Sequence, residues 1–226
     1  MWTKRIKVQR ISGPQRRKKE DQLVLDSEYD LQCNSLQATF NAVPGLTKEM
    51  IVGFLFHKEK INSYNDIKTI EAEENKFIVE LNELCAESPT PQSKWALNAK
   101  FLFSKMYDFQ DKAILFRDCA ISHSSALGKE NEIICFAEDI ERMQAVYKTI
   151  GTCLIENYDL SETIFLCSSK LDKALIRTLH RLGIGVYVTR VGATGTAYDY
   201  AQEHQLTLIG FCRAQKCNLY CGELYT

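Results

Sequence analysis

The second half of the chain alternates short apolar runs with longer amphipathic stretches. Apolar runs bounded by turn residues predict strands, and apolar residues three or four positions apart predict helices. The predicted strands are Ala113–Phe116, Glu132–Phe136, Thr163–Cys167, Gly185–Thr189 and Leu206–Phe211. The predicted helices are Arg142–Ile155, Lys170–Leu182 and Thr194–His204. Such alternation predicts an α/β fold, with a mixed sheet flanked by helices.

The first ninety residues are richer in predicted strands than the rest. Strands are predicted around Ile6 and Val8, at 22–25, at 29–33 and at 77–81. Pro44-Gly45 interrupts the chain, and Thr47 is predicted to cap a helix. A further helix is predicted from Ser93, after a Pro-containing loop at 84–92. We therefore predict a smaller strand-rich sub-domain at 1–90 and an α/β domain at 91–226.

Charge is distributed unevenly along the chain. The net charge is −1, but residues 1–20 hold eight basic residues against Glu20 alone, and the rest carries −8. An acidic field of that size argues against a general nucleic-acid binder. The basic run Arg16–Lys19 is predicted to be a solvated loop between two strands. No run of eighteen apolar residues occurs, so no membrane partner is expected.

The nine cysteines indicate free thiols rather than a disulfide framework. Their number is odd and no apolar export signal precedes them, so a cytoplasmic location is expected. No Cys-x-x-Cys pair occurs, so no metal site is predicted. Cys85 differs from the others because it stands in the Pro-containing loop. It is either a free surface cysteine or a reactive thiol, although nearby Glu87 would raise its pKa.

Several predicted strands end in polar or small residues, where ligands of α/β sheets bind. Arg190–Gly195 leads into a helix, so it either binds an anion or forms a tight turn. His123 is either a pocket residue or a histidine hydrogen-bonded to backbone at a strand end. Glu138 and Asp139 either hold a sugar or guanine group or cap the helix that follows them.

Five segments together resemble one family, the formate dehydrogenase accessory proteins called FdhD. Gly53-Phe-Leu-Phe-His-Lys-Glu-Lys-Ile61 is similar to the family's Gly-Phe-Leu-Phe-x-Glu-Gly-Ile-Ile block. Glu138-Asp-Ile-Glu-Arg-Met-Gln-Ala-Val-Tyr-Lys-Thr-Ile-Gly151 is similar to its Glu-Asp-Val-Gly-Arg-His-Asn-Ala-Val-Asp-Lys-Val-Ile-Gly. The other three are Phe116–Leu127, Thr189–Thr194, and Leu206–Arg213 followed by Asn218–Gly222.

The resemblance implies a cytidine-deaminase-like fold, a homodimer and a cytoplasmic sulfurtransferase. Such a protein takes persulfide sulfur from a cysteine desulfurase and passes it to the bis-molybdopterin guanine dinucleotide cofactor of formate dehydrogenase. Cys85 would carry the sulfur, with no permanently bound cofactor. The cofactor, or a GDP-like nucleotide, would be bound by residues that match the family motifs or follow the predicted strands: His123, Asp139, Arg142, Lys148, Arg190, Thr194, Arg213 and Asn218.

The chain departs from the family pattern at its loop. The family has Cys-x-x-Cys there, whereas Cys85-Ala-Glu-Ser88 keeps only the first thiol. One thiol can still hold a persulfide. An alternative is a protein that binds the molybdenum cofactor or its guanine nucleotide without moving sulfur. Nucleoside deamination would need a His/Cys zinc signature with an adjacent Glu, which this sequence lacks.

Overall fold

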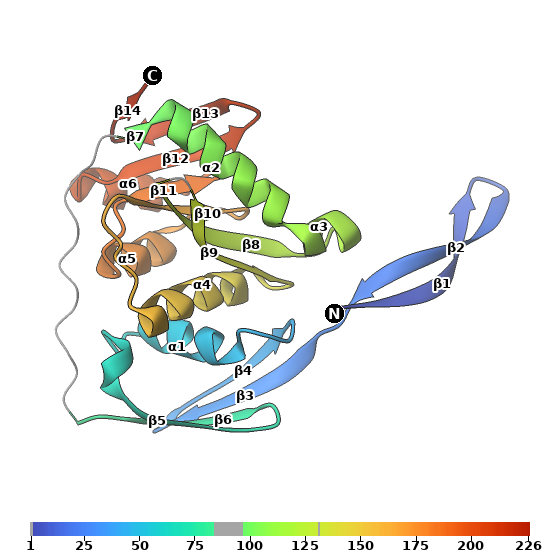
Figure 1. Ribbon diagram of the computed structural model, residues 1–226, viewed down its shortest axis with the longest axis horizontal. Coiled ribbons are helices and arrows are strands. Elements are labelled where there is room, and N and C mark those ends of the chain that lie inside the picture. Colours follow the sequence, from blue (N-terminus) through green and yellow to red (C-terminus); the bar gives the residue numbers. More distant parts are fainter. Residues whose placement is uncertain (1, 84–96, 131) are drawn as a thin grey trace.

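A six-stranded mixed sheet forms the centre of the molecule (Figure 1). The computed structural model describes residues 2–83, 97–130 and 132–226. Strands β10, β11 and β12 are parallel, and β8 and β13 run antiparallel to their neighbours, which confirms the predicted mixed sheet. In spatial order the strands are β13 (Lys216–Cys221), β12 (Thr207–Arg213), β11 (Val186–Thr189), β10 (Thr163–Cys167), β8 (His123–Lys129) and β9 (Glu132–Asp139).

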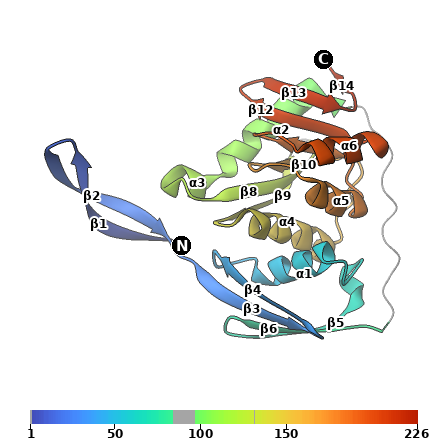
Figure 2. The same cartoon turned by 180° about the vertical axis from the view of Figure 1, so that it is seen from behind.

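Helices cover both faces of this sheet, as the alternation predicts. Helix α2 (Ala99–Lys112), followed by α3 (Ile114–Cys119), lies on one face, where Leu102 and Met106 pack against Ile164 and Val188. Helices α4 (Arg142–Glu156), α5 (Lys173–Arg181) and α6 (Gly195–Glu203) lie on the other (Figures 1 and 2). Two short strands, β7 (Leu97–Asn98) and β14 (Leu224–Tyr225), pair near the C-terminus.

A second layer is built on the outside of α4. Helix α1 (Thr47–His57) packs on α4, and its other side is covered by a four-stranded sheet. The order of that sheet is β4 (Leu36–Ala42), β3 (Ser27–Cys33), β6 (Lys76–Leu81) and β5 (Ile67–Glu73), with a 3-10 turn at Tyr64–Asp66 before β5. Every residue from Met50 to Phe56 is buried, since α1 is enclosed on both sides.

Two glycines allow α1 and α4 to cross at close range. A Cβ atom on Gly53 would lie 2.0 Å from the carbonyl oxygen of Tyr147, and one on Gly151 would lie 1.8 Å from that of Glu49. No side chain fits at such distances, so each glycine lets the backbone of the other helix approach. This explains why glycine stands at these two positions of the segments that resemble the FdhD family.

Strands β1 (Thr3–Ser12) and β2 (Gln15–Val24) form a separate two-stranded ribbon. Figures 1 and 2 show it leaving the body where β3 begins and pointing away from both sheets. None of its residues is buried. A two-residue turn, Gly13 with φ of 57° and Pro14, connects the strands.

Two predicted elements are wrong. Ala113–Phe116, predicted as a strand, contributes to α3, because a short apolar run has no periodicity that separates strand from helix. Arg16–Lys19, predicted as a loop, lies within β2, because the turn is made by Gly13 and Pro14 instead. The predicted strand Thr163–Cys167 is confirmed with those bounds, and the predicted helix Arg142–Ile155 ends one residue later.

Thr47, predicted to cap a helix, is instead the first residue of α1, and Leu46 before it makes no side-chain capping bond. The other predicted elements are confirmed with shifted ends or lie outside the described residues. The C-terminal helices begin at Lys173 and Gly195, after the capping residues Asp172 and Thr194. The predicted loop at 84–92, the first residues of the predicted helix at Ser93, and the boundary between residues 90 and 91 fall in the undescribed segment 84–96, so that boundary stays a prediction. In the described ranges, no helix has the length and apolar character needed to cross a membrane.

Candidate functional site

The candidate site lies at the edge of the large sheet where four strands end. Strands β9, β10, β11 and β12 run in the same direction, so their carboxyl ends share this edge. Helices α4, α5 and α6 begin there. His123, expected to follow a strand, instead begins β8, opposite Asp139, and reaches the same edge because β8 runs the other way. The fold thus brings together residues from five separate segments.

Two loops at this edge are joined by hydrogen bonds. The amide of Leu171 donates to the carbonyl of Gly192 at 3.2 Å, and the amide of Thr194 donates to the carbonyl of Leu171 at 2.9 Å. Below them, the hydroxyl of Thr189 donates to the carbonyl of Ser169 at 2.5 Å. These bonds hold the loop after β10 against the loop after β11, so the floor of the site is a fixed surface.

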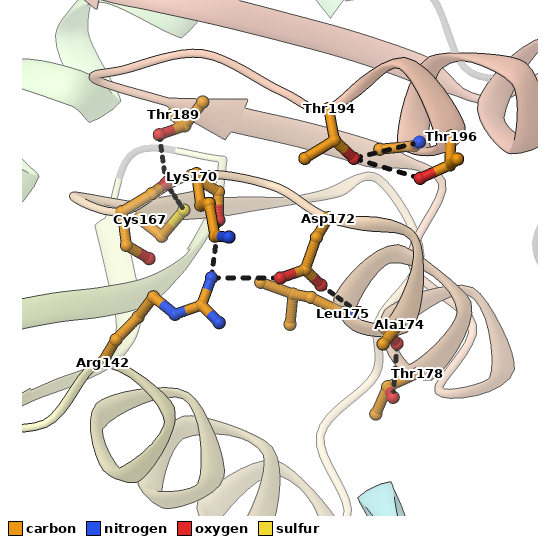
Figure 3. A network of polar contacts seen from close by, with 12 residues as sticks. Arg142, Cys167, Lys170, Asp172, Ala174, Leu175, Thr178, Thr189, Thr194 and Thr196 are labelled. Carbon is orange, nitrogen blue, oxygen red and sulfur yellow. Dashed lines mark hydrogen bonds and ion pairs between the residues drawn. The ribbon is translucent and has the colours of Figure 1, made fainter.

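Arg142, the first residue of α4, crosses from its helix to the loop after β10. Figure 3 shows its guanidinium directed at Asp172, with 3.1 Å between Nη1 and Oδ2, and at the carbonyl of Lys170 at 3.4 Å. Asp172 also caps α5, accepting from the amide of Leu175 at 3.1 Å. The Arg142 side chain remains 27% exposed. Its charge is therefore held in place and still accessible.

Three helix N-termini make this edge favourable for anions. Thr194, predicted as the first residue of a helix, caps α6 by accepting from the amide of Ala197 at 3.3 Å. Arg190 follows β11 directly, and its amide donates to the carbonyl of Cys167 at 3.2 Å. Helix N-termini carry partial positive charge, and Lys170 and Arg190 add full charges, whereas the charge of Arg142 is shared with the Asp172 carboxylate. Phosphate groups are the anions that such an arrangement binds.

Asp139 and Lys148 form a buried pair at the base of this region. Lys148 Nζ lies 2.7 Å from Asp139 Oδ2 and donates to the carbonyl of Val43 at 2.7 Å. The amide of Val43 donates in turn to Asp139 Oδ1 at 3.2 Å. The two side chains are 0% and 2% exposed, and burial raises the pKa of Asp139 against the effect of the ammonium. They connect α4 to the end of β4, and their contact with a cofactor stays a prediction.

Glu138 caps a helix, but not the helix that follows it, which was one of its two predicted alternatives. Its carboxylate accepts from the amides of Leu115 at 2.8 Å and Phe116 at 3.1 Å, and from the Ser122 hydroxyl at 2.9 Å. The helix it caps is α3, which precedes it in the chain, and not α4, which follows it. No local pattern in the sequence indicates that choice.

Arg213 and Asn218 lie on the β12–β13 hairpin, at the outer side of the large sheet, and both are exposed. A hollow of about 730 Å³ between α2 and the hairpin turn is lined by Arg213 together with Lys100 and Tyr107. The structure thus separates these two predicted site residues from His123 and Arg142 by the width of several strands.

Lys170 and Asp172 are not among the predicted site residues. Their carbonyl and carboxylate oxygens nevertheless accept from the Arg142 guanidinium and hold it in place. The signal available in the sequence is their place directly after a predicted strand, in and next to the segment Ser168–Lys170. Ser168 has a related role, since its hydroxyl accepts from the amide of Ser124 at 2.9 Å and so joins β8 to this loop.

Eight of the nine cysteines lie in the described residues, and burial raises the pKa of all eight thiols. The pKa of Cys135 reaches about 11 and that of Cys212 about 12. Thiols of this kind stay protonated and unreactive at neutral pH. Cys85, the predicted sulfur carrier, lies outside the described residues. Among the described side chains, no group of three or more His, Cys, Asp and Glu could hold a metal ion.

Comparison with known proteins agrees with the predicted resemblance. A protein named sulfur carrier protein FdhD from Methanothermobacter thermautotrophicus is 25% identical over 91% of this chain and 92% of its own. One of the same name from Saccharolobus solfataricus is 25% identical over 96% of this chain and 95% of its own. Protein FdhD of Methanocaldococcus jannaschii is 24% identical over 98% of both chains.

A solved structure shares the fold. The crystal structure of a protein described as a formate dehydrogenase accessory protein of Desulfotalea psychrophila superposes with a TM-score of 0.86, at 17% identity and over 98% of both chains. The family model described as FdhD/NarQ matches residues 75–224, which include every strand end of the candidate site. The chain belongs to the FdhD/NarQ family.

Proposed function

We propose that this chain is a cytoplasmic sulfur carrier. It would take persulfide sulfur from a cysteine desulfurase on Cys85 and deliver it to the bis-molybdopterin guanine dinucleotide cofactor of formate dehydrogenase. The relatives named sulfur carrier proteins support the carrier role. The formate dehydrogenase accessory protein with the same fold supports the acceptor.

The observation that carries the proposal is the raised pKa of the eight described thiols. A carrier must attack as thiolate, and burial raises the pKa of each of the eight described cysteines. These shifts disfavour the eight described thiols as carriers, which supports Cys85, the thiol that the resemblance names. Its position in the sequence, between Phe77–Leu81 and Pro89, matches that of the Cys-containing loop to which the resemblance points.

The first step is thiol exchange with a persulfide. The Cys85 thiolate attacks the outer sulfur of the donor's persulfide and forms a new S–S bond. The donor's own S–S bond breaks, and the donor cysteine leaves as thiolate. At the acceptor, the cofactor would supply the electron pair for its new bond to the outer sulfur, and the S–S bond on Cys85 would break with Cys85 leaving as thiolate. The cofactor would thereby be oxidised by two electrons, the two that the sulfane sulfur requires.

The acceptor would bind at the edge where α4, α5 and α6 begin. A guanine dinucleotide carries a diphosphate, and the helix N-termini with Arg142 and Arg190 supply positive charge for it. The fixed loops after β10 and β11 would keep these groups in place as the ligand arrives.

The test of the carrier role is mass spectrometry after incubation with a desulfurase and cysteine. Wild-type protein should gain one sulfur atom on Cys85, and Cys85→Ser should gain none. Cys119→Ser is the matched control, because Cys119 is only half-buried and should leave the labelling unchanged. Labelling of the Cys85→Ser variant at wild-type level would refute the assignment.

A second function, binding the guanine nucleotide of the cofactor without moving sulfur, is favoured by the same positive edge. Measuring GDP affinity by calorimetry alongside persulfide labelling distinguishes the sulfur-carrier function from nucleotide binding alone. Arg142→Ala should weaken GDP binding about 10- to 100-fold, because it removes one charge-assisted contact. Arg117→Ala, a 58% exposed arginine on α3, is the control. Binding with no labelling of Cys85 would assign the chain to the second function.

A further inference from the structure

The β12–β13 hairpin brings two cysteines close to its turn. Strand β12 holds Cys212 and β13 holds Cys217, and the first and last residues of the turn Arg213–Lys216 pair with each other. The two central turn residues, Ala214 and Gln215, both have left-handed backbones, with φ of 47° and 58°. A two-residue turn of this kind fixes the register of the strands on either side. The next residues after the turn are Cys212 on one strand and Cys217 on the other.

A β-bulge in β12 places these two cysteines opposite each other. The next pair away from the turn joins Gly210 to β13, and between that pair and the turn β12 has two residues where β13 has one. The extra residue is Phe211, because its φ is 50° and its amide donates to the carbonyl of Val191, at 2.7 Å, instead of to β13. A bulge leaves its extra residue unpaired. Cys212 therefore faces Cys217 directly.

Both thiols lie on the face of the large sheet that α2 covers. Cys212 is fully buried in the apolar cluster between α2 and the sheet, and Cys217 packs against the same cluster while partly exposed. Burial, and then the nearby Cys217 thiol, raise the pKa of Cys212 to about 12. Opposed residues of antiparallel strands have Cα atoms about 4.5–5.5 Å apart. A disulfide spans about 4.4–6.8 Å between Cα atoms, so an S–S bond fits this pair.

We propose that Cys212 and Cys217 are a redox-sensitive pair that a low-molecular-weight disulfide oxidises reversibly to an intramolecular disulfide. Cys217, the accessible thiol, loses its proton and attacks one sulfur of the small disulfide, whose S–S bond breaks and releases one thiolate. Cys212, as thiolate, then attacks the Cys217 sulfur and releases the second thiolate. The two cysteines lose two electrons and two protons, and the small disulfide gains them as two thiols. This inference does not depend on the sulfur-carrier function.

The surroundings of the pair suit an oxidant that carries carboxylates. The turn residues Arg213, Ala214 and Gln215 line the hollow of about 730 Å³ beside α2, together with Lys100 and Tyr107. Among the described residues that line this hollow, none is acidic. Lys100 and Arg213 supply positive charge for the carboxylates of a molecule such as glutathione disulfide. An S–S bond would close residues 212–217 into a ring and so fix the turn that lines the hollow.

The exchange is slow at neutral pH. Burial raises the pKa of Cys217, so few copies carry a thiolate there, and only the thiolate attacks. The rate of disulfide formation should therefore rise about tenfold for each pH unit between about pH 7 and about pH 9. The second step is intramolecular and is favoured by the short separation. The pair thus responds to lasting oxidation and not to brief contact with a persulfide donor.

Peptide mapping of the full chain tests the pair, because trypsin cleaves after Arg213 and Lys216, which both lie between the two cysteines. The protein is incubated with glutathione disulfide at about pH 8.5, alkylated, and digested without reduction. In the wild-type digest, the peptide that ends at Arg213 should be joined to the peptide that begins at Cys217. Dithiothreitol should separate the two peptides. Cys217→Ser and Cys212→Ala should each give no joined pair, and circular dichroism checks that both variants fold.

Cys221→Ser is the matched control. Cys221 lies on the same strand and the same tryptic peptide as Cys217, but a register shift between Leu208 and Ile209 turns it to the other face of the sheet. There it packs against the cluster that contains α4 and α5. This variant should form the joined pair as wild type does. A wild-type protein that gains only glutathione adducts, a joined pair that persists in Cys217→Ser, or one that is lost in Cys221→Ser would each overturn the proposal.

Discussion

Replacing Gly151 by alanine should separate the two helices that join the layers of the molecule. The new Cβ atom would lie 1.8 Å from the carbonyl oxygen of Glu49, 2.5 Å from its carbon and 2.9 Å from its Cα. Contacts shorter than 3.0 Å essentially never occur for Cβ, so the backbones must part by about 1.2 Å at this point. All three atoms belong to the main chain of α1 and cannot rotate away.

The expected cost follows from two opposing effects. Alanine gains about 1 kcal/mol over glycine inside a helix. Overpacking costs about 1–3 kcal/mol and more where nothing can yield. A gap of about 0.5–1 Å also forfeits about a quarter to a half of each dispersion contact between buried neighbours such as Ile51 and Ile150. We expect a net loss of about 2–4 kcal/mol in the free energy of unfolding, or a Tm lower by about 5–15 °C.

Urea denaturation followed by circular dichroism measures this change. Gly195→Ala is the matched control, because Gly195 begins α6 and no atom lies within 4 Å of the point that its Cβ would occupy, so this variant should be neutral or slightly stabilising. Gly53→Ala acts at the same crossing, so the double variant with Gly151→Ala should lose less than the sum of the single losses. A Gly151→Ala protein within about 0.5 kcal/mol of wild type would refute the reasoning.

Three further predictions concern charged groups. Lys148→Met should cost about 3–5 kcal/mol of unfolding free energy by leaving the Asp139 carboxylate buried and unpaired, and adding Asp139→Asn should recover more than half of it in the same assay. Burial, and then Lys58, lower the pKa of His57 below its unfolded value near 6.5, so the unfolded chain binds more protons. The stability that His57 contributes should be complete above about pH 6.5 and lost as the pH falls, and His57→Gln should flatten this part of the pH profile of Tm. Asp172→Ala removes a helix cap and should lower the unfolding free energy by about 1–2 kcal/mol, while also weakening GDP binding if Arg142 needs its partner.

The large sheet was predictable because its parallel strands are short apolar runs between helices. Thr163–Cys167 is buried on both faces, so its residues are mostly apolar and predict a buried strand. The strand at His123–Lys129 was not predicted, because Ser124, Ser125 and Gly128 interrupt its apolar character and their burial depends on partners far along the chain. Ser125, for example, is satisfied by the hydroxyl of Thr149 in α4 at 2.7 Å.

The candidate site was predictable to the extent that it follows from strand ends. Arg190 directly follows a predicted strand, and Arg142 and Thr194 are the first residues of predicted helices; all three lie at one edge of the sheet. Lys148 sits in the middle of a predicted helix, and its partner depends on how α4 packs against the end of β4. A sequence pattern gives which face of a helix is apolar, but not which buried ammonium meets which buried carboxylate. Contact of either group with a cofactor stays a prediction.

Helix α4 contacts the backbone of α1 at Gly151, so a change in the distance between the two helices there would tilt α4. This contact point lies nine residues from Arg142, about 13 Å along the helix axis. A small tilt there would move the Arg142 guanidinium at the N-terminus of α4, so we expect the position of this charge to depend on how closely α1 approaches in the other layer. We therefore expect substitutions at this crossing to change the proposed GDP affinity before they unfold the protein.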